Sequence, residues 1–232
     1  MHLGLIGGIG PASTVVYYQR LTDAMRALNM PLELTIVNAD ANTLVKNNLA
    51  VDRMAQAHVY PNLISHLNSA SADCAVLTSL GGHFCFDETV PLSKLPLVSA
   101  VTPLDEFFAN TNLKTVGILG SEVVMRTALY GQFQKTKTVA PDDLEGTGKA
   151  YLNMALSGAC SDAKREFFLE EGRKLVQHKG ADAVVPAKTD LGPAFYGQTT
   201  EYKVIDALDV HVDLLVSLAT GKAQLNDHAV GG

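Results

Sequence analysis

The chain opens on an apolar segment that runs into a cluster of glycines, and this junction constrains the fold more than any other stretch. Residues 1–6 are largely apolar, Gly7-Gly-Ile-Gly10 follows, and Pro11 begins a run with helical character. Proline is tolerated in a first helical turn because the N–H that it lacks has no intrahelical partner there. Ser13 and Thr14 can assist the helix start. The junction therefore predicts a strand, a tight loop and a helix.

Such a loop gathers N–H groups at the positive end of a helix and favours an anion, whether a phosphate or a carboxylate. The glycines lack the G-x-G-x-x-G spacing of dinucleotide-binding loops, and no Gly-Lys-Ser/Thr follows them. A nucleotide ligand is therefore disfavoured. The alternative without a ligand is that the glycines serve only the tight turn.

The remainder of the chain alternates strands with helices. Strands are expected at residues 32–37, 75–77, 115–120 and 181–185, with a short apolar run at 97–101. Helices are expected at 51–67, 121–133, 163–179 and 202–219, with a helix start at 104–108 and a loop at 137–148. This alternation predicts an α/β protein with mostly parallel sheets.

A second strand-into-glycine junction, Thr115-Val-Gly-Ile-Leu-Gly120, repeats the theme of the opening and suggests two similar lobes with a cleft between them. We expect residues 1–100 plus about 205–222 in the first lobe and about 101–204 in the second. Residues 223–232 are expected to form a flexible tail.

Ligands of parallel α/β sheets bind at the carboxyl ends of the strands. Four loops are expected there: Gly7 to Thr14, Asn38 to Thr43 with Asn42, Thr78 to His83, and Pro186 to Asp190. Lys188 follows an apolar strand, which disfavours its charged form and makes it a candidate base unless an anion or Asp190 keeps it charged. The alternative is an ammonium that reaches solvent. A structural role is the more common one for an isolated histidine such as His83.

Composition excludes several partners. The formal net charge of −6 argues against nucleic acid or an anionic membrane as the main partner. No apolar run approaches the roughly 20 residues of a membrane span, and the N-terminus lacks the features of a secretory signal, so we expect a cytoplasmic protein. Cys74, Cys85 and Cys160 have no zinc-type or redox-type spacing, and an odd number suits no disulfide framework.

Four segments in order resemble the aspartate/glutamate racemase superfamily, and the similarity runs from about residue 2 to about residue 218. They are Gly7-Gly-Ile-Gly-Pro-Ala-Ser-Thr-Val-Val-Tyr-Tyr18, Ala72-Asp-Cys-Ala-Val76 with the loop ending in His83, Val116-Gly-Ile-Leu-Gly120, and Gly180-Ala-Asp-Ala-Val-Val185. The resemblance implies two similar α/β lobes with the active site in the cleft between them, commonly in a homodimer. It also implies racemisation without pyridoxal phosphate or metal.

The resemblance further implies that each lobe contributes one catalytic cysteine as an acid or base. Two opposed groups are needed because inversion at Cα requires proton removal on one face and proton delivery on the other. The family motif Cys-Asn-Thr-Ala-His matches Ser79-Leu-Gly-Gly-His83, and Gly-Cys-Thr-Glu matches Ala187-Lys-Thr-Asp190. Ser79 and Lys188 thus replace the two catalytic cysteines. Leu80-Gly81 replaces the substrate-gripping Asn-Thr pair, whereas His83 and Thr189 match.

The candidate site follows from these matches. Ser79 and Lys188 are the candidate catalytic residues, and Cys85 and Cys160 are possible substitutes, although neither offers two opposed thiols. The candidate substrate-binding residues are Gly8, Ile9, Gly10, Ser13, Thr14, Asn42, Gly81, Gly82, His83, Thr189 and Asp190.

The expected function is a racemase-like isomerase that transfers a proton at Cα of a small carboxylate or amino acid. Serine with an ordinary hydroxyl is a very weak base, so a symmetric two-thiol mechanism is not available. Two alternatives stay open: a lyase or decarboxylase of the same superfamily, and a non-catalytic descendant that binds a carboxylate as a sensor or subunit. No cofactor and no metal are expected.

Overall fold

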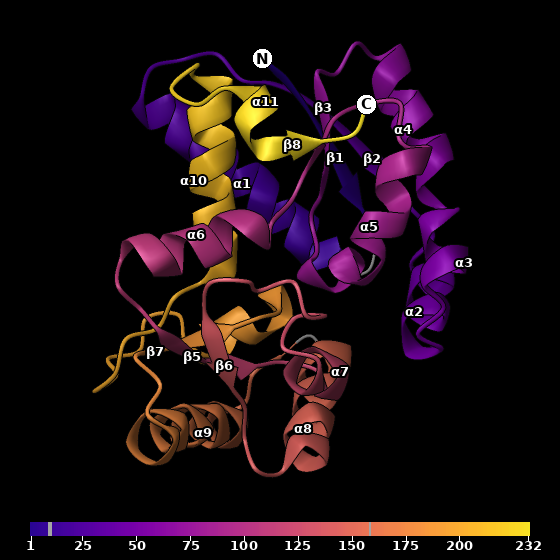
Figure 1. The fold of residues 1–232 in the computed structure, drawn as a ribbon. Helices are drawn as coiled ribbons and strands as arrows, with labels where there is room; N and C mark the ends of the chain where they lie inside the picture. The colour runs from indigo at the N-terminus through magenta and orange to yellow at the C-terminus, as the bar shows by residue number, and fades with distance from the viewer. Residues whose placement is uncertain (9–10, 158) are drawn as a thin grey trace. The chain divides into compact units, whose positions relative to one another are not determined.

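The computed structural model describes residues 1–8, 11–157 and 159–232, and the chain divides into two compact units (Figure 1). Unit 1 consists of Met1–Pro103 and His211–Gly232, and unit 2 consists of Leu104–Val210. Each unit holds strands of a largely parallel sheet joined by helices. The α/β class expected from the alternating pattern is confirmed.

Unit 1 contains a five-stranded sheet in the order β2-β1-β3-β4-β8. The strands are β1 (His2–Gly7), β2 (Glu33–Asn38), β3 (Cys74–Leu77), β4 (Leu97–Val98) and β8 (Ala229–Val230). The first four are parallel, and β8 joins β4 antiparallel. The final residues, expected as a flexible tail, therefore have secondary structure and complete the sheet.

Helices cover both faces of this sheet. Figure 1 shows α1 (Pro11–Ala27) beside α10 (Ala207–Ala219) on one side of the strands and α4 (Tyr60–Ser69) on the other. The Tyr17 hydroxyl and His211 Nδ1 link α1 to α10 at 2.7 Å. The remaining short elements of unit 1 are α2 (Ala41–Leu49), α3 (Arg53–Ala57), η1 (Leu80–Cys85), α5 (Phe86–Thr89), η2 (Val90–Leu92) and α11 (Leu225–His228). Helix α6 (Thr102–Asn110) begins at the end of unit 1 and lies mostly in unit 2.

The prediction of a single helix at residues 51–67 is wrong. Val51 has a positive φ of 52°, and the Asp52 side chain accepts a hydrogen bond from the Ala55 N–H, which starts α3. Pro61 then occupies the first turn of α4. A proline there removes an N–H that a continuous helix would need, so the segment breaks into two helices.

Unit 2 contains a three-stranded parallel sheet in the order β6-β5-β7. Its strands are β5 (Thr115–Leu119), β6 (Lys137–Val139) and β7 (Ala183–Pro186). Its helices are α7 (Glu122–Arg126), α8 (Leu144–Ser157), α9 (Asp162–Lys179) and η3 (Thr189–Ala194). Phe168 is fully buried in the core, where it packs with Leu119, Tyr151 and Leu175.

Three expectations in this unit need correction. The helix expected to reach residue 133 ends at Arg126. Just after it, the Thr127 hydroxyl donates a hydrogen bond to the Val123 carbonyl and accepts one from the Tyr130 N–H. The polar stretch 137–148, expected as a loop, contains β6 and the start of α8. The last helix begins at Ala207 rather than 202, because Asp206 Oδ1 accepts the Leu208 N–H.

The two units repeat one strand arrangement. In unit 1 the chain passes from β1 to β2 on one side and then to β3 on the other, and in unit 2 it passes from β5 to β6 and then to β7. Each unit therefore has a switch point, between β1 and β3 and between β5 and β7. Ligands of open α/β sheets bind at the carboxyl ends of the strands beside such a point.

No helix in the part of the chain that the structure describes is both long enough and apolar enough to cross a bilayer.

Phe168 tests the core of unit 2 against a neighbouring control. Replacing this fully buried ring with alanine should lower the free energy of unfolding by about 3–5 kcal/mol, because a cavity replaces it. Phe167, which is 38% exposed, should tolerate the same change at much smaller cost. Urea denaturation of both variants measures the difference, and equal losses would contradict this core assignment.

Candidate active site

Thr78 joins the ends of the two central strands of unit 1. Its hydroxyl donates to the Ile6 carbonyl of β1 at 3.0 Å, and Thr14 Oγ1 lies 2.8 Å from the same hydroxyl. The Ser13 hydroxyl donates to the Thr78 carbonyl. Thr78, Ser13 and Thr14 are all buried. The start of α1 is thus fastened to the end of β3 by side-chain hydroxyls.

The glycines of the opening junction are required by close contacts. Gly8 has a φ of +147°, which disfavours any residue with a Cβ. A Cβ at Gly7 would lie 2.5 Å from Thr14 Oγ1, and one at Gly8 would lie 2.7 Å from a Leu44 methyl carbon. The turn therefore needs glycine at both positions, whether or not a ligand binds there.

Ser79 follows Thr78 at the entry to η1. Its backbone is extended, with φ −144° and ψ 123°, and its side chain makes no hydrogen bond to another described residue. Its carbonyl accepts the Gly82 N–H at 3.0 Å and lies 2.9 Å from His83 Nδ1. The main chain of Ser79 is held firmly, while its hydroxyl can hydrogen-bond with a ligand.

His83 is completely buried, and both of its ring nitrogens bind backbone groups. Nε2 accepts the Ala100 N–H at 3.0 Å, so Nδ1 carries the proton that is donated to the Ser79 carbonyl. Burial lowers the pKa of His83 to about 4, and the ring stacks on Phe86 with centroids 5.2 Å apart. His83 is therefore a neutral residue that positions Ser79, and it is not available as a base.

A small pocket opens beside Ser79, and its cavity volume of about 10 Å³ is enough for roughly one water molecule. Gly7, Gly8 and Gly82 contribute backbone to it, and Leu44 and Tyr60 contribute side chains. The Tyr60 hydroxyl accepts a hydrogen bond from the Gln56 amide at 3.0 Å. A Cβ at Gly82 would approach this hydroxyl to 3.1 Å. The pocket thus combines glycine backbone with the hydroxyl-bearing residues Tyr60, Thr78 and Ser79.

Lys188 occupies the corresponding position in unit 2. It enters η3 with φ −148° and ψ 132°, and the residue is only 9% exposed. Its carbonyl accepts the Leu191 N–H at 2.9 Å. An added Cβ on Gly120, which follows β5, would lie 3.6 Å from Lys188 Cγ. The stem of the lysine therefore lies against the end of the central strand.

The backbone around Ser79 and around Lys188 is arranged alike. The Thr78 N–H donates to the Ile6 carbonyl of β1 at 3.1 Å, and the Ala187 N–H donates to the Leu119 carbonyl of β5 at 2.8 Å. Each strand then continues by one residue in extended conformation into a 3-10 helix. Ser79 and Lys188 thus hold equivalent positions at the two switch points.

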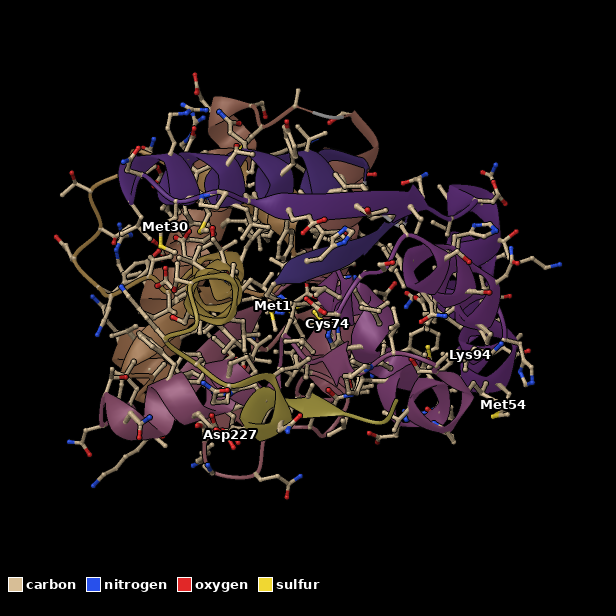
Figure 2. The ribbon with its side chains drawn as sticks, turned by 90° about the horizontal axis from the view of Figure 1, so that it is seen from above. Met1, Met30, Met54, Cys74, Lys94 and Asp227 are labelled. Carbon is tan, nitrogen blue, oxygen red and sulfur yellow. The ribbon has the colours of Figure 1, made fainter. Side chains whose placement is uncertain are left out.

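The cysteines do not supply alternative bases in unit 1. Cys85 is buried, with its Sγ 3.5 Å from the Gly82 carbonyl, and burial raises its pKa to about 12. Burial also raises the pKa of Cys74 to about 11, and Figure 2 shows this residue in the interior, away from Met54 and Lys94 at the periphery. Cys160 is partly exposed in unit 2, with its Sγ 3.7 Å from the Ser161 carbonyl.

The other predicted residues divide into three groups. Gly81 and Gly82 are buried in η1, and the Gly81 carbonyl accepts the Asn48 amide at 3.1 Å. Asn42 is exposed in the first turn of α2, which Asp40 caps. Ile9 and Gly10, and the side chains of Thr189 and Asp190, lie outside the described residues.

Sequence reasoning missed part of the site. The sequence pattern places Thr78 in a loop at a strand end and gives it no role, although a hydroxyl directly after a buried strand is a usable signal. Tyr60 lies in the misassigned helix, so its approach to Gly82 could not be predicted. The buried Tyr17 and His211 pair joins residues 194 positions apart, and no local pattern indicates it.

Among the described residues, no group of three or more His, Cys, Asp or Glu could hold a metal.

Comparison with known proteins agrees with this architecture. The profile of the Asp/Glu/Hydantoin racemase family matches residues 6–215, and the chain belongs to this family. A candidate Asp/Glu racemase from Yersinia pestis superposes with a TM-score of 0.84 at 21% identity, over 95% of this chain and 100% of that one. An aspartate racemase homologue from Pyrococcus horikoshii gives 0.78 at 21% identity, over 94% and 99%.

Aspartate racemase from Picrophilus torridus gives a TM-score of 0.72 at 19% identity, over 95% of each chain. These likenesses establish the two-lobe racemase fold that the sequence resemblance implied.

Thr78→Val tests the hydroxyl tie between the strand ends. The variant keeps the shape but leaves the Ile6 carbonyl and the Thr14 hydroxyl without this partner, so the free energy of unfolding should fall by about 1–3 kcal/mol. Thr78→Ser keeps the hydroxyl and is the matched control. Chemical denaturation measures both, and equal losses for the two variants would show that the hydroxyl is not the stabilising group.

His83 should make the protein less stable in acid. Its folded-state pKa of about 4 lies below the ordinary 6.5, so the unfolded chain takes up the proton first as the pH falls. Stability is therefore complete above pH 6.5 and is lost between pH 6.5 and 4, at about 1.4 kcal/mol per pH unit. Urea denaturation between pH 7.5 and 5 should show a shallower slope in His83→Gln, and an unchanged slope would refute this assignment.

Proposed function

We propose that this protein is a racemase-like isomerase that moves a proton at Cα of a small carboxylate or amino acid, with Ser79 and Lys188 in the places of the family's two cysteines. The equivalent placement of these two residues carries the proposal. Each stands at the same backbone position after a strand beside the central one, where α/β sheets bind ligands.

Lys188 is assigned the role of the base. In its neutral form the amine accepts the Cα proton and becomes an ammonium, while the electron pair of the broken C–H bond stays on the substrate as an enolate. The new positive charge then stabilises that negative charge. The surroundings of Lys188 support this role, because the residue is only 9% exposed and its stem lies by Gly120.

Ser79 is assigned the role of a proton relay rather than that of a base. Its hydroxyl has no basic partner among the described residues, and an unassisted serine hydroxyl is a very weak base. It can instead pass a proton from water to the enolate, taking one proton as it gives another. The His83 ring supports this step by fixing the Ser79 carbonyl.

The remaining parts of the proposal come from the resemblance and the composition. The loop of Gly8 to Thr14, together with Thr189, holds the carboxylate, and no pyridoxal phosphate takes part. The protein works as a homodimer in the cytoplasm. Fixed backbone groups of a glycine turn suit an anion, which supports the carboxylate site.

Exchange of the Cα hydrogen tests the activity itself. Incubation with L-Asp, L-Glu and related small acids in D₂O should place deuterium at Cα of at least one acid, because the enolate is reprotonated from solvent. Proton NMR or mass spectrometry reads the incorporation. Absence of exchange with every acid would sink the proposed chemistry.

Lys188→Met tests the base in any acid that exchanges. Methionine keeps an unbranched stem beside Gly120 and removes the amine, so exchange should fall by about 10²-fold or more. Lys174→Met, which removes an exposed lysine of α9 paired with Glu171, is the control and should leave the rate unchanged. Full activity in Lys188→Met would remove this residue from the mechanism.

A non-catalytic carboxylate binder is the second candidate function. The observation that favours it is the burial of Cys74 and Cys85, which leaves unit 1 without a reactive thiol. In that case dicarboxylates or amino acids should raise the melting temperature without any exchange or product. Release of CO₂ or of a cleaved fragment would instead indicate the decarboxylase or lyase chemistry of the superfamily.

A further inference from the structure

The small cavity beside Ser79 separates the interior of unit 1 from a more exposed position. Its volume of about 10 Å³ is close to the smallest that holds a water molecule. Ser79 is half-buried, whereas the other described residues that line the cavity are buried. Ser79 is therefore the lining residue best placed to contact both the cavity and a substrate.

The cavity depends on the lack of a side chain at residue 82. The family motif Cys-Asn-Thr-Ala-His has an alanine at the position that Gly82 occupies here. A Cβ on Gly82 would lie 3.1 Å from the Tyr60 hydroxyl and 3.8 Å from a methyl carbon of Leu77. Tyr60 and Leu77 both line the cavity, so a methyl group between them would take space that a water needs.

Tyr60 brings a polar group to this space. The residue is 2% exposed, and its oxygen accepts the Gln56 amide at 3.0 Å. A phenolic hydroxyl both donates and accepts hydrogen bonds, so Tyr60 can bind a water in addition to Gln56. The Thr78 hydroxyl, by contrast, already has two partners. Tyr60 and Ser79 are thus the two side-chain partners for a water, and a buried water needs at least two.

We propose that this cavity binds one water between the hydroxyls of Tyr60 and Ser79, and that this water supplies the proton that Ser79 passes to the substrate. Tyr60 is then a positioning residue, because it acts on the reaction only through the water and Ser79. The role of the water in the reaction rests on the proposed Ser79 relay, whereas its binding in the cavity does not.

Protons and charge balance over one turnover. The O–H bond of Ser79 breaks as its proton forms the new C–H bond with the electron pair of the enolate. Ser79 takes a proton from the water, whose broken O–H bond leaves its electron pair on the hydroxide. The hydroxide recovers a proton from solvent, and the Lys188 ammonium releases to solvent the proton that it removed from Cα. One substrate hydrogen is thus exchanged for one solvent hydrogen.

A crystal structure of the full chain, at a resolution that shows ordered waters, tests the site without any activity. It should show one water within hydrogen-bond distance of Tyr60 Oη and Ser79 Oγ, and Gly82→Ala should lack this water. A wild-type cavity without the water would overturn the proposal, even in an active isomerase. The water in a protein that exchanges no acid would establish the site and refute its role.

Kinetics with an acid that exchanges its Cα hydrogen tests the role. Gly82→Ala should lower kcat about tenfold, because its methyl excludes the proton donor, and should change KM less than about twofold. Tyr60→Phe should also lower kcat, because the water loses one of its two partners. Tyr202→Phe is the matched control, since it removes a hydroxyl that donates to the Leu169 carbonyl in unit 2, and it should change neither constant.

The double variant Tyr60→Phe/Gly82→Ala separates this role from a structural one. If both residues act through one water, kcat of the double variant should equal that of Gly82→Ala, because the water is already excluded. Losses that multiply, or an unchanged kcat in both single variants, would refute the role. The wild-type crystal structure needs no variant, so the site stays testable where a variant misfolds.

Discussion

The structure depends on a single constraint at the switch point of unit 1, where the end of β1, the start of α1 and the end of β3 must meet without steric conflict. Thr78 meets it by donating to the Ile6 carbonyl and contacting Thr14. Gly7 and Gly8 avoid the steric conflict because they have no Cβ at the points where Thr14 and Leu44 approach. The glycine motif is thus explained by packing before any ligand is considered.

This explanation changes the meaning of the opening motif. The sequence alone suggested that Ser13 and Thr14 contact substrate, yet their hydroxyls bind Thr78 in the interior. Their contribution to binding is therefore to hold the turn in shape. The pocket beside this turn is lined by Gly7, Gly8 and Ser79, and the Ser79 hydroxyl makes no hydrogen bond to another described residue.

The equivalence of the two units gives the proposed function its physical basis. A repeated strand order places residue 79 and residue 188 at the same backbone position, with the same inward N–H bond one residue earlier. One position holds a small hydroxyl and the other a buried lysine. This asymmetry is what separates the proposed one-base mechanism from exchange between two like groups.

Much of the fold could be predicted from the sequence, because apolar strands followed by glycine are strong local signals. β1, β3, β5 and β7 fell close to their expected places, and the positions of Ser79 and Lys188 followed from them. The break between α3 and α4 was missed although Pro61, in the first turn of α4, is a sequence signal for a new helix. The start of α3 could not be predicted, since it depends on the positive φ of Val51 and on the Asp52 cap. A structural role for His83 was expected from the sequence, but its bond to the Ala100 N–H was not. The role of Tyr60 was hidden, because this residue lies in a misassigned helix.

The most direct test of the central claim restores both thiols at once. If Ser79 and Lys188 hold the two catalytic positions of the family, the double variant Ser79→Cys/Lys188→Cys should exchange the Cα hydrogen of a small acidic amino acid. The shifted pair Thr78→Cys/Ala187→Cys should not. Deuterium incorporation measured by mass spectrometry gives the answer. A folded Ser79→Cys/Lys188→Cys protein with no exchange above the shifted pair would contradict the account.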